Sequence, residues 1–172
     1  MNYDQYIRDI PDWPKEGVVF KDITPLLANA EAFKAAVEEM AAPFKHAGIT
    51  KVLGAEARGF LFGTVIAYYL GAGFVPARKP GKLPYDTFQA VYELEYGTDT
   101  LEIHQDGLSA DDVVLIVDDV LATGGTAAAK ASLVTGIGAK LAGYSFFIEL
   151  DFLNGRNKLD PEVAVHSLVH VG

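Results

Sequence analysis

Two adjacent carboxylates, Asp118 and Asp119, follow directly after five consecutive apolar residues, 113–117. The apolar run is mostly β-branched and too short for a free-standing helix, so it predicts a strand that is buried on both faces. Open α/β sheets bind their ligands at the carboxyl ends of the strands, and an unpaired buried carboxylate would be costly. We therefore expect both carboxylates to face a cleft.

The segment 122–126, Ala-Thr-Gly-Gly-Thr, comes next and opens onto an alanine-rich helix that is expected to reach about Thr135. Glycine adopts backbone angles closed to other residues, and the first amides of a helix have no partner within it. Together with the threonine hydroxyls and the helix dipole, such a turn can bind a phosphate dianion. Carboxylates accept hydrogen bonds from sugar hydroxyls or hold a magnesium ion, so the whole stretch suits a ribose 5-phosphate.

Simpler interpretations of the same stretch stay open from the residues alone. A glycine-rich turn can be only a turn, and paired aspartates can be only a solvated loop, although their adjacency disfavours both interpretations. The stretch is not a Walker loop, because no Lys-Ser or Lys-Thr pair follows the glycines, and it does not contain the pattern GxGxxG.

A second strand–turn–helix unit places an arginine at a helix entrance. Residues 50–55 predict a buried strand and residues 60–70 predict a helix, with Glu-Ala-Arg-Gly at 56–59 between them. An arginine at the start of a helix opposes the helix dipole unless an anion is bound there. We therefore expect Arg58 to bind an anion.

Three further cations, Arg78, Lys79 and Lys82, follow a third short strand predicted at 74–77. The formal net charge of −9 argues against a general nucleic-acid surface. A local basic cluster on an acidic chain suits a small anionic ligand, with a solvated loop as the alternative.

Composition indicates a single globular domain over residues 1–172, because the length permits a sizeable core and half of the residues are apolar. No apolar run reaches membrane-spanning length, and the amino terminus lacks the pattern of a signal peptide. The sequence contains no cysteine, which excludes disulfides and thiolate metal sites. We expect a cytoplasmic protein that binds neither membranes nor nucleic acid.

Three strand–turn–helix units and a basic loop predict a Rossmann-like α/β fold, with a mostly parallel central sheet flanked by helices. The site is expected along the carboxyl ends of the strands. The other predicted elements are a short helix within 3–10, an apolar run at 18–20, a helix at 30–46 capped by Asn29, a hairpin of 89–96 with 100–104, a strand at 141–150 and an edge strand at 163–171.

The segment 117–126, Val-Asp-Asp-Val-Leu-Ala-Thr-Gly-Gly-Thr, resembles the 5-phosphoribosyl 1-pyrophosphate (PRPP) binding motif of the type I phosphoribosyltransferases. The resemblance extends from Pro11 to about Leu159, and it is strongest to the adenine-specific members of that family. The narrower resemblance is carried by the segments 17–27, 56–63, 78–84 and 94–97.

This resemblance implies the type I phosphoribosyltransferase fold, with a base-binding segment at 1–28 and a mobile β-hairpin lid at 78–107. It also implies a reaction of purine salvage, in which adenine and PRPP give AMP and pyrophosphate by pentosyl transfer. Mg2+ is the implied cofactor and is held mainly by PRPP and water, with no metal ligand from the protein. The implied assembly is a homodimer.

The resemblance also assigns the site residues. Glu95 is expected to be the base that takes a proton from adenine, Asp118 to stabilise the cationic ribose, and Tyr96 to close over the reacting centre with the lid. The ribose and 5-phosphate of PRPP are expected at Asp118, Asp119, Ala122, Thr123, Gly124, Gly125 and Thr126. The pyrophosphate is expected at Glu56, Ala57, Arg58, Arg78, Lys79 and Lys82, with a cis peptide bond between Glu56 and Ala57. Adenine is expected at Val19, Phe20, Lys21 and Val120.

Two departures from the family pattern bear on the lid and on the base. Residues 85–91 match the family loosely, and Lys21 stands where an arginine is frequent. An oxopurine substrate such as hypoxanthine, guanine or xanthine would need a donor to its 6-oxo group, and we find Lys140 as the candidate after the phosphate loop.

Two other classes of protein also stay open. A regulator that senses PRPP without turnover would carry a DNA-binding helix pair or a basic RNA surface, and the sequence shows neither. A structural nucleotide-binding module would have no use for a basic lid or for Glu95.

Overall fold

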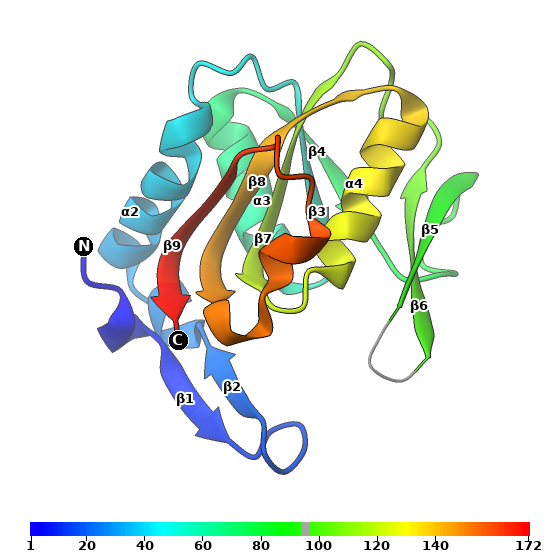
Figure 1. The fold of residues 1–172 in the computed structure, drawn as a ribbon. Coiled ribbons are helices and arrows are strands. Elements are labelled where there is room, and N and C mark those ends of the chain that lie inside the picture. The colour runs from blue at the N-terminus through cyan, green and yellow to red at the C-terminus, as the bar shows by residue number, and fades with distance from the viewer. Residues whose placement is uncertain (94–96) are drawn as a thin grey trace.

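A five-stranded, fully parallel sheet forms the centre of the molecule (Figure 1). The computed structural model describes residues 1–93 and 97–172. In spatial order the strands are β4 (Gly73–Ala77), β3 (Lys51–Ala55), β7 (Val113–Leu121), β8 (Lys140–Leu150) and β9 (Val165–Val171). The Rossmann-like α/β class and the edge position of the last strand are therefore confirmed.

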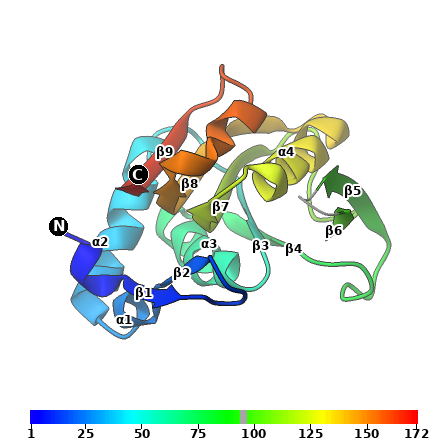
Figure 2. The same cartoon turned by 60° about the horizontal axis from the view of Figure 1, so that its bottom comes forward.

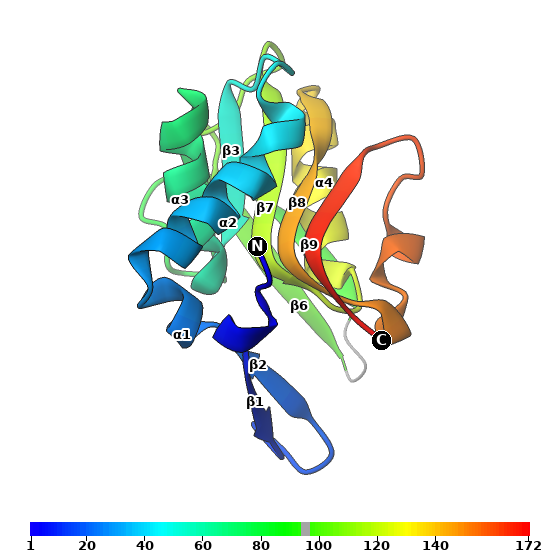
Figure 3. The same cartoon turned by 90° about the vertical axis from the view of Figure 1, so that its left-hand side faces the viewer.

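Helices cover both faces of this sheet, α2 (Ala30–Ala41) and α3 (Arg58–Leu70) on one face and α4 (Gly125–Ile137) on the other (Figure 3). The central strand β7 alternates between the two cores. Leu115 and Val117 belong to the cluster under α2 and α3, whereas Val114 and Ile116 belong to the cluster under α4. The apolar run therefore forms the doubly buried strand that its composition predicts.

Strand β7 continues to Leu121, past the end expected at Asp118 and Asp119. The extension occurs because β8 is long enough to keep pairing with it, with Asp118 opposite Phe146 and Leu121 opposite Glu149. The carboxylates consequently lie on the last, rigid part of a central strand, where packing from both sides fixes their backbone.

Two antiparallel hairpins lie outside the sheet, along the end of the molecule at which β3 and β7 finish (Figure 2). One pairs β1 (Arg8–Pro11) with β2 (Val19–Asp22), and the short helix α1 (Thr24–Leu27) follows it. The other pairs β5 (Thr87–Glu93) with β6 (Thr98–His104), which confirms the predicted hairpin, and β5 packs against α4.

Two predicted helices differ from the structure. Residues 3–10 form a 3-10 turn, Asp4–Tyr6, followed by strand β1, because pairing of Ile10 with Phe20 on β2 overrides the local preference. The helix expected at 30–46 ends at Ala41, since Pro43 cannot continue the α-helical hydrogen bonds and the chain tightens into a 3-10 turn, Ala42–Phe44. Its amino-terminal cap is as predicted: Asn29 accepts a hydrogen bond from the Ala32 amide at 2.9 Å.

After β8 the chain forms two more 3-10 turns, Asp151–Leu153 and Gly155–Lys158, before it enters β9. These turns place Gly155 directly against the loop between β7 and α4. None of the described helices has both the length and the apolar character needed to cross a membrane.

Candidate active site

A cavity of about 340 Å³ opens at the carboxyl ends of β3 and β7. It is closed by the β1–β2 hairpin, by the turn between β3 and α3, and by the end of β7. The sequence-predicted residues that line it are Val19, Phe20, Lys21, Glu56, Ala57, Arg58, Asp118, Asp119, Val120, Ala122 and Thr126. Three segments that are distant in sequence therefore meet at one site.

A smaller cavity of about 70 Å³ adjoins the first one and is surrounded by the loop between β7 and α4. Its lining includes Thr123, Gly124 and Gly125, and the two cavities share Asp118 and Thr126 among their lining residues. Asp118 thus stands at the junction between the smaller cavity and the larger one.

The loop itself is shaped by a close approach of two chain segments. Gly124 caps α4 with a φ of 82°, a left-handed conformation that favours glycine. A Cβ atom at Gly124 would collide with the carbonyl oxygen of Gly155, so a side chain is excluded on steric grounds as well. The loop presents the amino-terminal amides of a thirteen-residue helix to the smaller cavity.

Asp118 has partners on both carboxylate oxygens. Its Oδ2 accepts a hydrogen bond from Lys130 Nζ at 2.6 Å, and its Oδ1 accepts one from the Asp119 amide at 3.1 Å. Gly59, in the first turn of α3, leaves room for this carboxylate, because a Cβ atom there would lie 2.7 Å from Oδ1. The side chain is therefore held in one orientation.

Asp119 is nearly completely buried, and its Oδ2 lies 2.9 Å from Arg58 Nε. Burial and then the neighbouring Asp118 charge raise the pKa of Asp119, Arg58 offsets part of this rise, and the net result is a pKa of about 7. The contact with Arg58 lacks hydrogen-bond geometry, so Oδ2 accepts no hydrogen bond from any described residue. Asp119 is also one of the residues that line the larger cavity.

Arg58 also contacts the aromatic ring expected to bind the base. Its guanidinium carbon lies 4.7 Å from the ring centroid of Phe20, and Trp13 packs edge-on against the same ring at 4.4 Å. Lys21, on the same strand, is bound by Asp9 at 2.7 Å. The residue for which the family pattern favours arginine thus has its charge paired within the hairpin.

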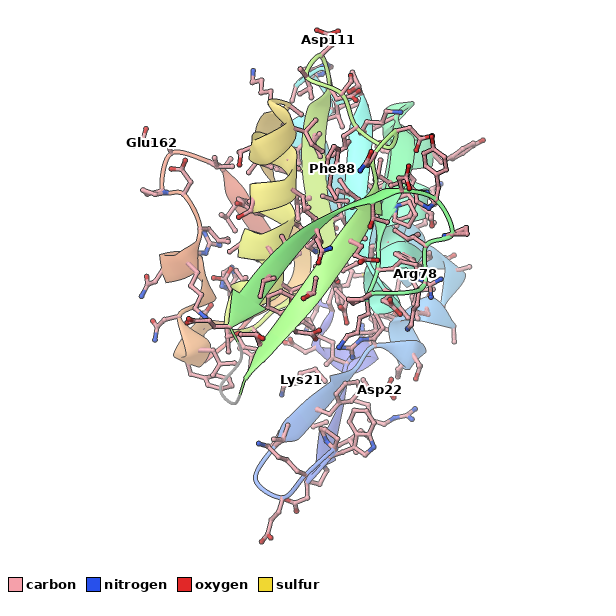
Figure 4. The ribbon with its side chains drawn as sticks, turned by 90° about the vertical axis from the view of Figure 1, so that its right-hand side faces the viewer. Lys21, Asp22, Arg78, Phe88, Asp111 and Glu162 are labelled. Atoms are coloured by element: carbon pink, nitrogen blue, oxygen red, sulfur yellow. The ribbon has the colours of Figure 1, made fainter. Side chains whose placement is uncertain are left out.

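The basic loop meets the site at Glu56. The Glu56 carboxylate accepts hydrogen bonds from Lys82 Nζ at 2.5 Å and from the Lys79 amide at 2.6 Å, and Arg78 Nε lies 3.5 Å away. Burial alone would raise the pKa of Glu56, but these three groups together hold it below its usual value. Figure 4 shows Arg78 beyond the end of β4 and Lys21 on the β1–β2 hairpin, on the same side of the molecule.

Comparison with known proteins agrees with this geometry. Residues 26–156 match the model of the phosphoribosyl transferase domain. A curated adenine phosphoribosyltransferase from Acidothermus cellulolyticus is 55% identical over 166 residues, covering 96% of this chain and 93% of the relative. The chain belongs to the adenine phosphoribosyltransferases.

Solved structures of adenine phosphoribosyltransferases share the whole fold. The Rhodothermus marinus enzyme superposes with a TM-score of 0.94 at 50% identity, covering 97% of this chain and 95% of that one. The Saccharomyces cerevisiae enzyme, solved in complex with adenine and an imino-altritol bisphosphate, has a TM-score of 0.89 at 43% identity, with 95% and 94% coverage.

Several residues assigned from the family pattern lie away from the two cavities or outside the described part of the chain. Arg78, Lys79 and Lys82 lie beside Glu56 rather than in the lining of the larger cavity, and Lys79 Nζ pairs with Asp99 at 2.6 Å. Glu95 and Tyr96 lie outside the described residues. The cis peptide bond between Glu56 and Ala57 is present.

Sequence reasoning missed two charged groups near the site of this adenine phosphoribosyltransferase chain. Lys130 is fully buried against Asp118, and a signal was available, since it stands four residues after the phosphate-loop Thr126 on the helix. Arg156 binds both oxygens of the buried Glu149, at 2.6 and 2.7 Å, and so anchors the turn that contains Gly155.

Glu149 also belongs to an acidic cluster with Asp151 and His170, whose ligand atoms lie within 4.8 Å of one another. Because Arg156 already occupies both Glu149 oxygens, and Ser167 Oγ donates a further hydrogen bond at 2.7 Å, this cluster is an ion-pair network within the chain. It stabilises the end of β8 and β9 beside the phosphate loop.

Proposed function

We propose that the chain transfers the 5-phosphoribosyl group of PRPP to adenine, forming AMP and releasing pyrophosphate in purine salvage. The observation that supports this most directly is the meeting of three segments around one pair of cavities, with Asp118 at their junction. The 5-phosphate binds at the Thr123–Thr126 loop, and adenine binds at the Phe20 ring and the backbone of Val19 and Lys21.

Asp118 and Asp119 accept hydrogen bonds from the ribose hydroxyls. Asp119 Oδ2 supports this assignment, since it is a buried acceptor without a hydrogen-bond donor among the described residues. As the bond to pyrophosphate lengthens, positive charge develops at the anomeric carbon, and the Asp118 carboxylate stabilises it electrostatically. A carboxylate held on both oxygens needs little reorganisation to do so.

The leaving pyrophosphate is bound by Arg58, by the backbone of Glu56 and Ala57, and by the lid cations Arg78, Lys79 and Lys82. In the described structure the cationic side chains contact carboxylates, Arg58 on Asp119 and Lys82 on Glu56. Binding of pyrophosphate therefore exchanges internal ion pairs for ion pairs with the ligand.

Mg2+ is the cofactor of this reaction in our proposal, and the carboxylates of the site fit an ion carried by PRPP and water. Asp118 and Glu56 are engaged by Lys130 and Lys82, so neither presents an open set of ligand oxygens. Asp119 Oδ2 can accept a hydrogen bond from water on such an ion. Bound Mg2+ supplies neutralisation of the pyrophosphate charge.

Glu95 acts as the base that removes a proton from the purine ring, and Tyr96 closes with it over the reacting centre. Both assignments rest on the resemblance of the segment 94–97 to the family. The lid of residues 78–107 excludes water during transfer, which prevents hydrolysis of PRPP. Val120 contributes to the adenine site from the wall of the larger cavity.

The active assembly is a homodimer in the cytoplasm. Support for a dimer comes from one face of α3, where four large apolar side chains are exposed: Leu61, Val65, Tyr68 and Tyr69. Tyr68 is 88% exposed, and burial of this large aromatic side chain against a second copy would be favourable. The cytoplasm is supported by a sequence without cysteine.

The test is formation of the corresponding nucleoside monophosphate from PRPP and adenine, hypoxanthine or guanine in the presence of Mg2+. Of the three bases, we expect only adenine to be turned over. We expect Glu95→Gln to lower kcat about a hundredfold or more, because general-base catalysis contributes that much. Glu93→Gln, an exposed residue of the same hairpin, is the matched control and should retain activity. Turnover on an oxopurine would overturn the base assignment, and PRPP binding without any turnover would overturn the enzymatic proposal.

A further inference from the structure

Lys130 is a fully buried lysine in the middle of α4. Its ammonium lies 2.6 Å from Asp118 Oδ2 and 3.5 Å from the carbonyl oxygen of Val117. Removing an ammonium group from water is costly, and an apolar side chain of similar length would fill the same space without that cost. The charge of Lys130 therefore requires a reason beyond packing.

Asp118 supplies this reason, because it stands beside a second carboxylate. The charge of Asp118 is the second cause, after burial, of the raised pKa of Asp119, which shows that the two groups repel each other. Each carboxylate is paired with a different cation: Asp119 is paired with the guanidinium of Arg58, and Asp118 is paired with the ammonium of Lys130. The remaining charged groups that line the cavity are Glu56 and Lys21, which are paired elsewhere.

The two cations differ in what else they can do. Arg58 has 41% of its side chain exposed and lines the cavity, so a ligand can draw it away from Asp119. Lys130 is completely buried and contributes nothing to the lining of either cavity. A ligand in the larger cavity therefore competes with Asp119 for Arg58, but a ligand in either cavity does not compete with Asp118 for Lys130.

We propose that Lys130 is a positioning residue for the ribose site, which holds the Asp118 carboxylate in a fixed orientation for the ribose hydroxyls and the anomeric carbon. The inference rests on the proposed role of Asp118. Lys130 acts through Asp118 and contacts no substrate. In this proposal the ribose is bound by the Asp118 carboxylate, whose orientation is fixed by its buried ion pair with Lys130.

A double-mutant cycle on PRPP binding tests this dependence. Affinity for PRPP with Mg2+ is measured by calorimetry for the wild type, Lys130→Met, Asp118→Asn and the double variant. We expect each single substitution to weaken binding about tenfold or more, and the double variant to bind no more weakly than Asp118→Asn. The exposed Lys140→Met is the matched control, with unchanged affinity.

Turnover distinguishes positioning from packing. Lys130→Met should lower kcat as well as PRPP affinity, and leave the KM for adenine within about twofold, because adenine does not contact Asp118 in the proposed complex. A variant that melts at a lower temperature but keeps its kcat would show a packing role and overturn the proposal.

Additive losses in the cycle would show that Lys130 acts independently of Asp118, which also overturns the inference while leaving the proposed function intact. An Asp118→Asn variant with unchanged PRPP affinity would instead overturn the proposed role of Asp118. If Lys130→Met does not fold, recovery of folding in the double variant supports the pair. Failure of both to fold would assign Lys130 to the core alone.

Discussion

Replacement of Asp119 by asparagine is expected to stabilise the protein increasingly as the pH rises. Asp119 is 4% exposed, and its pKa is raised from 3.8 to about 7 by burial and by the Asp118 charge, with Arg58 offsetting part of the rise. A carboxyl group whose pKa is higher in the folded than in the unfolded state stabilises folding fully below the unfolded pKa. That contribution is lost as the pH rises through about 7.

The magnitude follows from the size of the pKa shift. About three pKa units, at about 1.4 kcal/mol per unit, correspond to about 4 kcal/mol over the whole pH range. At pH 5 part of this stabilisation is already lost, because the unfolded chain is mostly ionised there. We expect about 3 kcal/mol of the effect to fall between about pH 5 and pH 8.5.

Urea unfolding of the wild type and of Asp119→Asn at these two pH values measures the effect. The stability of the variant relative to the wild type should increase by about 3 kcal/mol from the lower to the higher pH. The exposed Asp111→Asn should show no such change between the two values. A pH-independent difference for Asp119→Asn would refute the reasoning, and would mean that Arg58 outweighs burial in setting this titration.

Two further substitutions test the supports of the phosphate loop. Gly124→Ala should raise the KM for PRPP at least about tenfold, because its Cβ would strike the neighbouring turn and its φ of 82° disfavours a side chain; steady-state kinetics measures this, and Gly136→Ala, with open space around it, is the control. Arg156→Met should destabilise the fold by about 1.5–3 kcal/mol in urea unfolding, because the buried Glu149 loses its guanidinium partner and keeps the Ser167 hydrogen bond, whereas the exposed Arg8→Met should cost below about 1 kcal/mol. If Gly124→Ala and Gly136→Ala changed the KM equally, the steric argument would be wrong. If Arg156→Met and Arg8→Met destabilised the fold equally, the argument from the burial of Glu149 would be wrong.

The sequence predicts the backbone of the site well, because local patterns determine it. The run of β-branched residues before Asp118 and the glycines at 124 and 125 specify a strand, a tight turn and a helix without reference to the rest of the chain. The same holds for the turn at Arg58, which begins α3 as expected. Each of these features depends on residues within a few positions of one another.

Partners that come from distant segments are not predictable in this way. Nothing local relates Lys82 to Glu56, which stands 26 residues before it, since the pairing depends on how the loop after β4 packs. The strand at 8–11 illustrates the same limit, because its conformation is imposed by pairing with β2 rather than by its own composition. The helical spacing of Lys130 from Thr126 can be seen in the sequence, but the burial of Lys130 depends on the sheet beneath α4.

The cations of this site differ in how far they are buried, and this difference explains how an acidic chain can bind a polyanion. Arg58 and Lys82 have 41% and 46% of their side chains exposed, and their carboxylate partners hold them near the cavity until a phosphate competes for them. Lys130 is fully buried and cannot make that exchange. The exposed cations can therefore bind the ligand, whereas the buried cation holds Asp118, so an acidic chain with a net charge of −9 still presents exchangeable cations at its cleft.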